Sequence, residues 1–206
     1  ASMTLQAVTG RIWPAQYRDE PWIQATFIGN DWLTLLGAVP CLAAGIVLAG
    51  RGRSRGWLLW FGGLWYAVYN YAFYALGTVI NPSFPLYVAI LVLAAITLLR
   101  GMTHADIEWL AGRFGDGLPQ RTLGGYLIFV AVGLSVAWLG LWGSHVFGGA
   151  ELPVEETAFR LVAVLDLSMM VPALAGGGFL LWRGRHLGFV IAPMAAIQGA
   201  LYLTVL

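Results

Sequence analysis

Residues 84–100 read FPLYVAILVLAAITLLR, an apolar run whose only charged residue is Arg100 at its end. A helix rises about 1.5 Å per residue, so roughly 17 to 25 mainly apolar residues cross the hydrocarbon core of a bilayer. This run has that length and composition. Strands of membrane barrels instead alternate polar and apolar residues over about ten positions. The run therefore predicts a transmembrane α-helix.

Five further apolar stretches flank this run, at residues 32–50, 57–80, 122–143, 161–182 and 187–206. The whole chain is 59% hydrophobic and only 10% charged, whereas soluble domains carry about 25% charged residues. The sequence predicts an all-α fold, a polytopic membrane bundle of six transmembrane helices over residues 31–206. Residues 1–30 are expected to form an extracytoplasmic segment.

Arginine positions predict the orientation of this bundle, because Arg in short loops stays cytoplasmic. One side of the expected topology carries eight arginines and the other only three. The eight are Arg51, Arg53, Arg55, Arg100, Arg113, Arg121, Arg183 and Arg185, and the three are Arg11, Arg18 and Arg160. Both termini are therefore expected outside the cytoplasm.

Part of the chain resembles another part of itself. VPCLAAGIVLAGRGRSRGW, from Val39, aligns without a gap on VPALAGGGFLLWRGRHLGF, from Val171, with Pro40 on Pro172. The match predicts a parallel repeat in which spans 1 and 2 resemble spans 5 and 6. A proline inside a helix removes a hydrogen bond and kinks it, so each copy is expected to bend there. The bend would either line a site or only let neighbouring helices pack closely.

The links between spans carry their own signals. Thr103 with Asp106 fits a capping box and predicts a short helix on the inner surface, ending at Gly115. Gly148 and Gly149 predict a turn in the outer link. Glu156 and Arg160 are four residues apart and are expected to form an ion pair at the start of the fifth span.

Polar side chains within the spans are the candidate site, because ionisable groups in hydrocarbon cost about 2.5 to 3.5 kcal/mol to insert. Tyr66, Asn70 and Tyr74 share one face of the second span at helical spacing. The full candidate ligand-binding set is Asp166, Asn70, Tyr66, Tyr74 and Gln198 within the spans and Asp31 at the outer end of the first span. These groups are expected either to surround an outward-facing pocket or to act as hydrogen-bonding glue between helices.

Several function classes find no support in the sequence. A net charge of +1 gives no basic field for nucleic acid. The chain has no Lys for a Schiff-base pigment, and His104, His145 and His186 are too scattered for haem or zinc. No cofactor and no metal site are expected, and no catalytic residue is assigned.

The chain resembles a group of uncharacterised bacterial multi-pass membrane proteins. The resemblance rests on Gly29 to Asp31, YNYAFYALG (69–77), NPSFPLYVA (81–89) and VLDLSMMVPAL (164–174). It implies six spans and a place in the bacterial inner membrane, and it carries over no activity.

The leading expectation is a membrane protein that binds or transports a small, mostly apolar molecule through an aromatic and polar pocket. One alternative is a membrane enzyme acting on lipid or isoprenoid through Asp166 and Glu155 or Glu156. Another is a structural or assembly protein with no ligand. Membrane lipids are the expected partners, and small residues such as Gly133 and Ala137 leave a homo-oligomer open.

Overall fold

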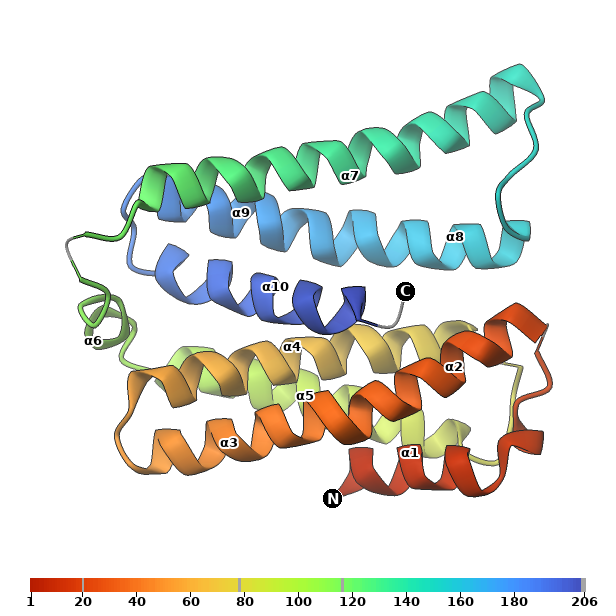
Figure 1. Ribbon diagram of the computed structural model, residues 1–206, viewed down its shortest axis with the longest axis horizontal. Helices are drawn as coiled ribbons and strands as arrows, with labels where there is room; N and C mark the ends of the chain where they lie inside the picture. Colours follow the sequence, from red (N-terminus) through yellow and green to blue (C-terminus); the bar gives the residue numbers. More distant parts are fainter. Residues whose placement is uncertain (20, 78, 116, 205–206) are drawn as a thin grey trace. The chain divides into compact units, whose positions relative to one another are not determined.

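The computed structural model describes residues 1–204 except 20, 78 and 116, and it leaves the side chain of Trp22 undescribed. Every regular element in that range is a helix (Figure 1). The α-helices are α1 (Ser2–Ile12), α2 (Pro21–Leu33), α3 (Val39–Gly50), α4 (Ser54–Gly77), α5 (Phe84–His104), α6 (Ile107–Ala111), α7 (Gln120–Gly148), α8 (Glu156–Leu165), α9 (Val171–Trp182) and α10 (Gly188–Leu203). A 3-10 turn, η1, covers Pro14–Gln16, and two π-helical segments cover Thr34–Ala38 (η2) and Asp166–Met170 (η3).

The chain divides into two compact units. The first comprises residues 1–105 together with 196–206, and the second comprises residues 106–195. The boundary near the C-terminus falls inside α10.

Four continuous helices are long and apolar enough to cross a membrane: Ile23–Gly50, Phe84–His104, Gln120–Gly148 and Glu156–Trp182. The first begins at residue 23, earlier than the expected 32, and runs through η2. The 24 residues of α4 are sufficient in length, but its many Trp and Tyr side chains make it less apolar, and α10 is apolar but only 16 residues long. The expected count of six spans stays a prediction.

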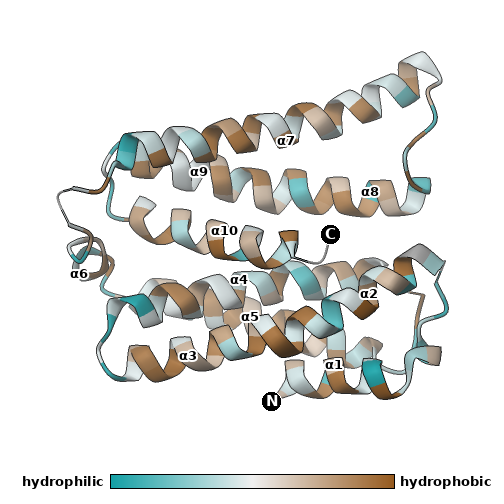
Figure 2. Cartoon of the chain, in the orientation of Figure 1, coloured by the Kyte–Doolittle hydropathy of each residue, from teal (hydrophilic) through white to brown (hydrophobic). Residues whose placement is uncertain are grey.

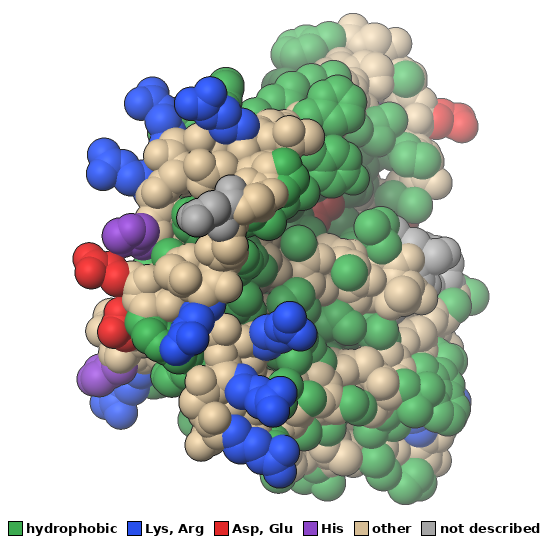
Figure 3. Space-filling view, turned by 60° about the vertical axis from the view of Figure 1, so that its left-hand side comes forward, with side chains coloured by type: hydrophobic (Ala, Val, Ile, Leu, Met, Phe, Trp, Pro, Cys, Tyr) green, Lys and Arg blue, Asp and Glu red, His purple; other side chains and the backbone are tan. Residues whose placement is uncertain are grey.

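The surfaces of these helices suit a lipid solvent. Large apolar side chains are exposed on α5 and α7, among them Val92, Ile96, Phe129, Val132 and Val136. In Figure 2 the apolar colour runs along α3 and α7, and the hydrophilic colour gathers mainly near the helix ends. Figure 3 shows Arg side chains projecting on the side that is turned forward, beside apolar flanks. Extensive apolar exposure is unfavourable in water and favourable against lipid tails.

Each expected proline kink takes the form of a π-helical turn placed just before the proline. The Val39 N–H donates to the carbonyl of Thr34, and the Val171 N–H donates to that of Asp166, five residues back in both cases. Pro40 and Pro172 follow directly. A proline ring clashes with the preceding turn of a regular helix, and a π turn is a wider alternative that keeps the backbone paired.

The turns after α3 and α9 also share their geometry. Gly52 has a φ of 70° and Gly184 a φ of 64°, values that favour glycine. The Arg53 N–H donates to the carbonyl of Leu48 and the Arg185 N–H to that of Leu180, both at 2.9 Å. Equivalent positions of the two aligned stretches therefore have the same local backbone pattern.

The links agree only in part with expectation. The short helix expected after Thr103 is present as α6, but its cap is Asp106, whose Oδ1 accepts from the Trp109 N–H at 2.8 Å. The Thr103 hydroxyl bonds back to the Arg100 carbonyl instead, so the expected capping box was wrong. The helix also ends at Gly112 rather than at Gly115.

In the outer link, Gly149 ends α7 with a φ of 66°, which confirms the turn expected there. The ion pair expected between Glu156 and Arg160 was wrong, because it is absent from the salt bridges of the described residues. Both side chains are exposed. An exposed pair gains little from contact because water screens the charges and two long side chains must be ordered.

Within the second unit, α7 and α9 pack closely through glycine. A Cβ on Gly124 would lie 2.5 Å from the carbonyl oxygen of Gly178 and 2.8 Å from the backbone nitrogen of Trp182. A Cβ on Gly178 would in turn meet the Gly124 carbonyl oxygen at 2.8 Å. Backbone atoms cannot move aside as a side chain can, so this contact requires glycine on both helices.

Gly124→Ala should therefore lower the free energy of unfolding by about 1 to 3 kcal/mol, the usual penalty of overpacking. Thermal unfolding in detergent would measure it. Gly125→Ala is the matched control, since a Cβ there meets nothing within 4 Å. Equal stability of the two variants would contradict the packing described.

Candidate functional site

A buried carboxylate organises the first unit. Asp31, on α2, is 0% exposed. Its Oδ1 accepts hydrogen bonds from Gln6 Nε2 at 3.0 Å and from the Tyr74 hydroxyl at 2.9 Å. Its Oδ2 accepts from the Tyr17 hydroxyl at 2.9 Å. Three donors compensate the loss of water around a buried carboxylate.

A second layer holds these donors in place. The Tyr71 hydroxyl donates to Gln6 Oε1 at 2.7 Å. The Tyr74 hydroxyl also lies 3.0 Å from the carbonyl oxygen of Phe27, and the two rings stack with centroids 4.9 Å apart. Gln6 thus bridges a tyrosine of α4 and the carboxylate of α2. We call Gln6, Tyr17, Asp31, Tyr71 and Tyr74 the Asp31 cluster.

Close approach of α1 makes this cluster feasible. A Cβ on Gly10 would overlap Asp31 Oδ2 and the Tyr17 hydroxyl oxygen. Gly10 and Gln6 lie four residues apart and share one face of α1. No role in the site was predicted for residues 1–30, and only this Gln and Gly spacing could have indicated the contribution of α1.

Two ionisable groups between η1 and α2, Tyr17 and Asp19, have raised pKa values. Burial raises the pKa of Tyr17, and the neighbouring Asp31 carboxylate raises it further. Tyr17 therefore stays protonated and keeps donating to Asp31. Burial also raises the pKa of Asp19, although the Val79 N–H, 2.8 Å from its Oδ1, opposes the shift.

The predicted face of α4 points into the first unit. Tyr66 is 1% exposed, Asn70 3% and Tyr74 0%. Tyr74 joins the Asp31 cluster, and the Tyr66 hydroxyl lies 3.2 Å from Thr34 Oγ1, one turn beyond Asp31. Asn70 Nδ2 has no hydrogen-bond partner among the described residues, and neither does the side-chain amide of the fully buried Gln198.

The remaining predicted residue, Asp166, lies in the second unit. It is 6% exposed, which confirms its expected burial, and it starts the η3 segment. The Trp138 Nε1–H of α7 donates to its Oδ2 at 2.9 Å. This bond orients the indole ring, because the acceptor itself is held in a helix.

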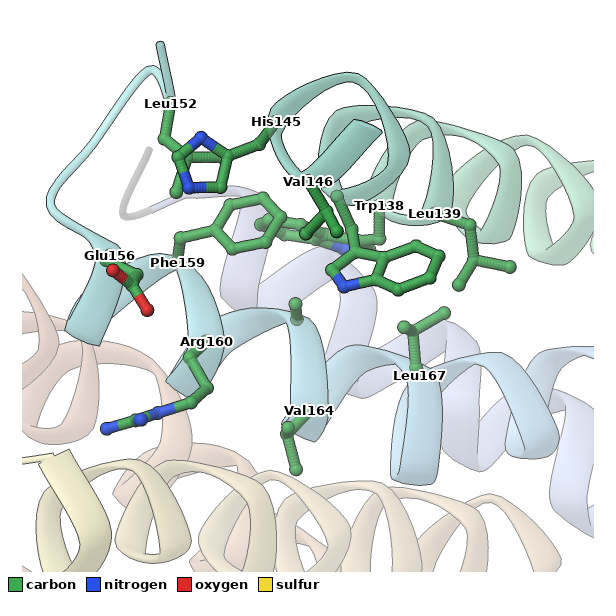
Figure 4. Close-up of a pocket in the computed structure, with 12 residues that line it drawn as sticks. Trp138, Leu139, His145, Val146, Leu152, Glu156, Phe159, Arg160, Val164 and Leu167 are labelled. Atoms are coloured by element: carbon green, nitrogen blue, oxygen red, sulfur yellow. The ribbon is translucent and has the colours of Figure 1, made fainter. Parts of the chain in front are cut away.

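Trp138 lines a cavity of about 430 Å³ in the second unit, where α7 and α8 face each other. Its walls are formed by Trp138, Leu139, Trp142, His145, Val146, Leu152, Glu156, Phe159, Arg160, Ala163, Val164 and Leu167 (Figure 4). Trp138 and Phe159 are not among the site residues predicted from the sequence. Their rings pack edge to face at 5.3 Å, a contact between residues 21 positions apart that periodicity does not reveal.

Polarity changes along this cavity. His145, Glu156 and Arg160 lie at one end in Figure 4, and Trp138, Leu139 and Leu167 lie at the other. Ligand sites commonly combine apolar walls with a few polar groups that orient the ligand. The described residues include no group of three or more His, Cys, Asp or Glu that could hold a metal ion. The arrangement favours binding of a molecule that is itself apolar at one end and polar at the other.

The Asp31 cluster should fasten α1 to the first unit. Asp31→Ala removes the carboxylate that accepts from Gln6, Tyr17 and Tyr74. Tyr74 keeps the Phe27 carbonyl and Gln6 keeps the Tyr17 hydroxyl, but the Tyr17 hydroxyl loses its acceptor, and a buried unpaired group costs about 1 to 3 kcal/mol. We expect faster hydrogen exchange of the backbone amides of residues 2–12, measured by mass spectrometry.

Asp31→Asn is the control for this experiment, because it keeps one carbonyl oxygen as acceptor. It should give an intermediate rate of exchange. Unchanged exchange in Asp31→Ala would show that α1 does not depend on the carboxylate.

Comparison with known proteins gives no family for this chain. No family model, no curated protein and no solved structure matches it. Its function is therefore inferred from the geometry of its own residues.

Proposed function

We propose that this chain is an integral membrane protein that binds a small, mostly apolar molecule in the cavity lined by α7 and α8. One observation carries the proposal: the cavity wall includes Trp138, whose indole is held by the buried Asp166. A carboxylate inside a membrane-length helix costs free energy to insert, so its presence there indicates a function. Orienting the Trp138 ring in the cavity wall is such a function.

The proposal includes six spans with both termini outside the cytoplasm. The fifth and sixth spans would be α4 and α10, in addition to the four membrane-length helices. The short α10 could still span, since shorter helices are tolerated where the bilayer thins or flanking residues reach the interface. Support for the orientation is the eight-to-three distribution of Arg, and all eight on the proposed cytoplasmic side are exposed. We place the protein in a bacterial inner membrane, as its resemblance to bacterial multi-pass proteins suggests.

We further propose that α3 with α4 and α9 with α10 are parallel repeats. The π segments, the following prolines and the positive-φ glycines support this, because each pair lies 132 residues apart in the sequence. Close contacts of glycines with the neighbouring helix also recur at equivalent positions of the two copies. A Cβ on Gly45 would lie 2.7 Å from the Trp60 nitrogen, and one on Gly177 would lie 3.0 Å from the Ala192 nitrogen, again 132 residues on.

Binding is better supported than catalysis on lipid or isoprenoid. Of the three carboxylates in the enzyme alternative, only Glu156 lines the cavity, and neither Asp166 nor Glu155 does. Asp166 Oδ2 is occupied by Trp138. The Asp31 cluster has its acceptors filled from within the chain, which suits a structural role, and neither Asn70 nor Gln198 lines the cavity.

Cysteine labelling tests the orientation. The two links are labelled through Ser54→Cys and Ala150→Cys, in a chain whose native thiol is removed by Cys41→Ala. Gly52 and Gly149 are avoided because their positive φ would strain a cysteine. A membrane-impermeant reagent should reach position 54 only from the cytoplasm and position 150 only from outside. The opposite accessibility would overturn the topology.

Ligand binding should depend on the bond between Asp166 and Trp138. A ligand that binds the native state raises its apparent stability by mass action. We expect Asp166→Asn and Trp138→Phe to reduce the thermal stabilisation given by a single-chain monoacylglycerol, because a freed or smaller ring lines the cavity less well.

Ser168→Ala is the control, since Ser168 is exposed, lies two residues from Asp166 and bonds only to the carbonyl of its own helix. It should leave ligand stabilisation unchanged. Equal stabilisation of wild type, Asp166→Asn and Trp138→Phe across a concentration series would remove this cavity from the proposed function.

A further inference from the structure

The charged end of the cavity presents two opposite charges that do not neutralise each other. Glu156 and Arg160 are exposed, line the cavity from α8 and lie four residues apart. Side chains at this spacing commonly form an ion pair, yet no salt bridge joins them among the described residues. In Figure 4 their charged ends lie apart, with the guanidinium below the carboxylate. Each charge is therefore available to a ligand.

The position of these charges matches the depth of a lipid headgroup. Glu156 is the first residue of α8, and His145 lies within the last turn of α7, so both border the link between two membrane-length helices. Trp138 and Leu167 lie two to three turns further along their helices. A molecule with its head at the link and its chain along Trp138 and Leu167 would have the orientation of a lipid in the bilayer leaflet.

The two charges also select the headgroup. The Arg guanidinium matches phosphate by shape and charge, and its stem packs against apolar surface. A carboxylate attracts an ammonium group. A purely anionic head would be repelled by Glu156 and a purely cationic head by Arg160, and such repulsion is an effective source of specificity.

Resting on the proposed function, we infer that the ligand is a zwitterionic single-chain amphiphile of the lysophospholipid type. Its phosphate would contact Arg160, its ammonium would contact Glu156, and its chain would lie against Trp138 and Leu167. A cavity of about 430 Å³ is at the small end of the usual range of ligand pockets, about 300 to 1,000 Å³, which favours one chain over two.

The test compares four amphiphiles of equal chain length on the full chain in maltoside detergent. They are lysophosphatidylethanolamine (zwitterionic), lysophosphatidylglycerol (anionic), an alkyltrimethylammonium (cationic) and a monoacylglycerol (uncharged). Brominated chains would quench the Trp138 fluorescence, identified as the part of the quenching that Trp138→Phe removes when both proteins are saturated with the amphiphile. We expect the zwitterion to bind about tenfold more tightly than the others, a difference that corresponds to about 1.4 kcal/mol.

Two variants should reverse this preference in opposite directions. Glu156→Gln should favour lysophosphatidylglycerol, and Arg160→Gln should favour the alkyltrimethylammonium. Glu155→Gln is the matched control, because Glu155 is an exposed neighbouring carboxylate outside the cavity wall. It should leave the order of affinities unchanged.

The outcomes separate the two claims. Quenching of Trp138 by all four amphiphiles with equal affinity, or preferences that neither variant changes, would overturn the headgroup assignment and leave the proposed function standing. Absence of Trp138 quenching by every amphiphile would overturn both.

Discussion

Inside a bilayer every backbone N–H and C=O must find its partner within the protein, because hydrocarbon offers none. This constraint explains why the described regular structure is helical and why its irregularities are small. Where Pro40 and Pro172 cannot donate, the preceding turn widens into a π helix, and the donors of Val39 and Val171 find carbonyls five residues back. The helices Ile23–Gly50 and Glu156–Trp182 therefore remain continuous through their prolines.

Close packing in lipid replaces the hydrophobic force that holds soluble helices together. Glycine is used where two backbones approach, as at Gly124 and Gly178 within the second unit. The same device serves a polar purpose in the first unit. Gly10 lets α1 come close enough for Gln6 to reach the carboxylate of Asp31. Small residues thus determine both how helices contact each other and which polar groups can meet.

The two buried aspartates illustrate different uses of an expensive group. Asp31 collects donors from α1, α4 and the turn before α2, and so ties distant parts of the first unit together. Asp166 holds an indole that forms part of a cavity wall. Asp31, with its acceptors filled by protein donors, stabilises the fold, whereas the oriented Trp138 ring beside the cavity can contact a ligand. This difference is the reason for placing the proposed binding site in the second unit.

The sequence by itself determined the helical class and the membrane setting, because long apolar runs and scarce charge are properties of the chain alone. It also determined local features, such as the turn at Gly149 and the positions of the two proline bends, since these depend on neighbouring residues. It predicted the burial of Asn70, Tyr74 and Asp166 from their polarity within apolar runs, but not that of Asp31, which it placed at the outer end of a span. These inferences need only a period of 3.6 residues and the cost of a polar group in hydrocarbon.

Only the tertiary structure decided which groups these residues meet. Gln6 reaches Asp31 across 25 positions and Tyr71 across 65, distances over which helical spacing carries no information. The cavity wall depends on how α7 lies against α8, and the separation of Glu156 from Arg160 depends on rotamers that a four-residue interval does not fix. Side-chain partners follow from the approach of whole helices, which is set by packing over many residues, and no single stretch of sequence contains it.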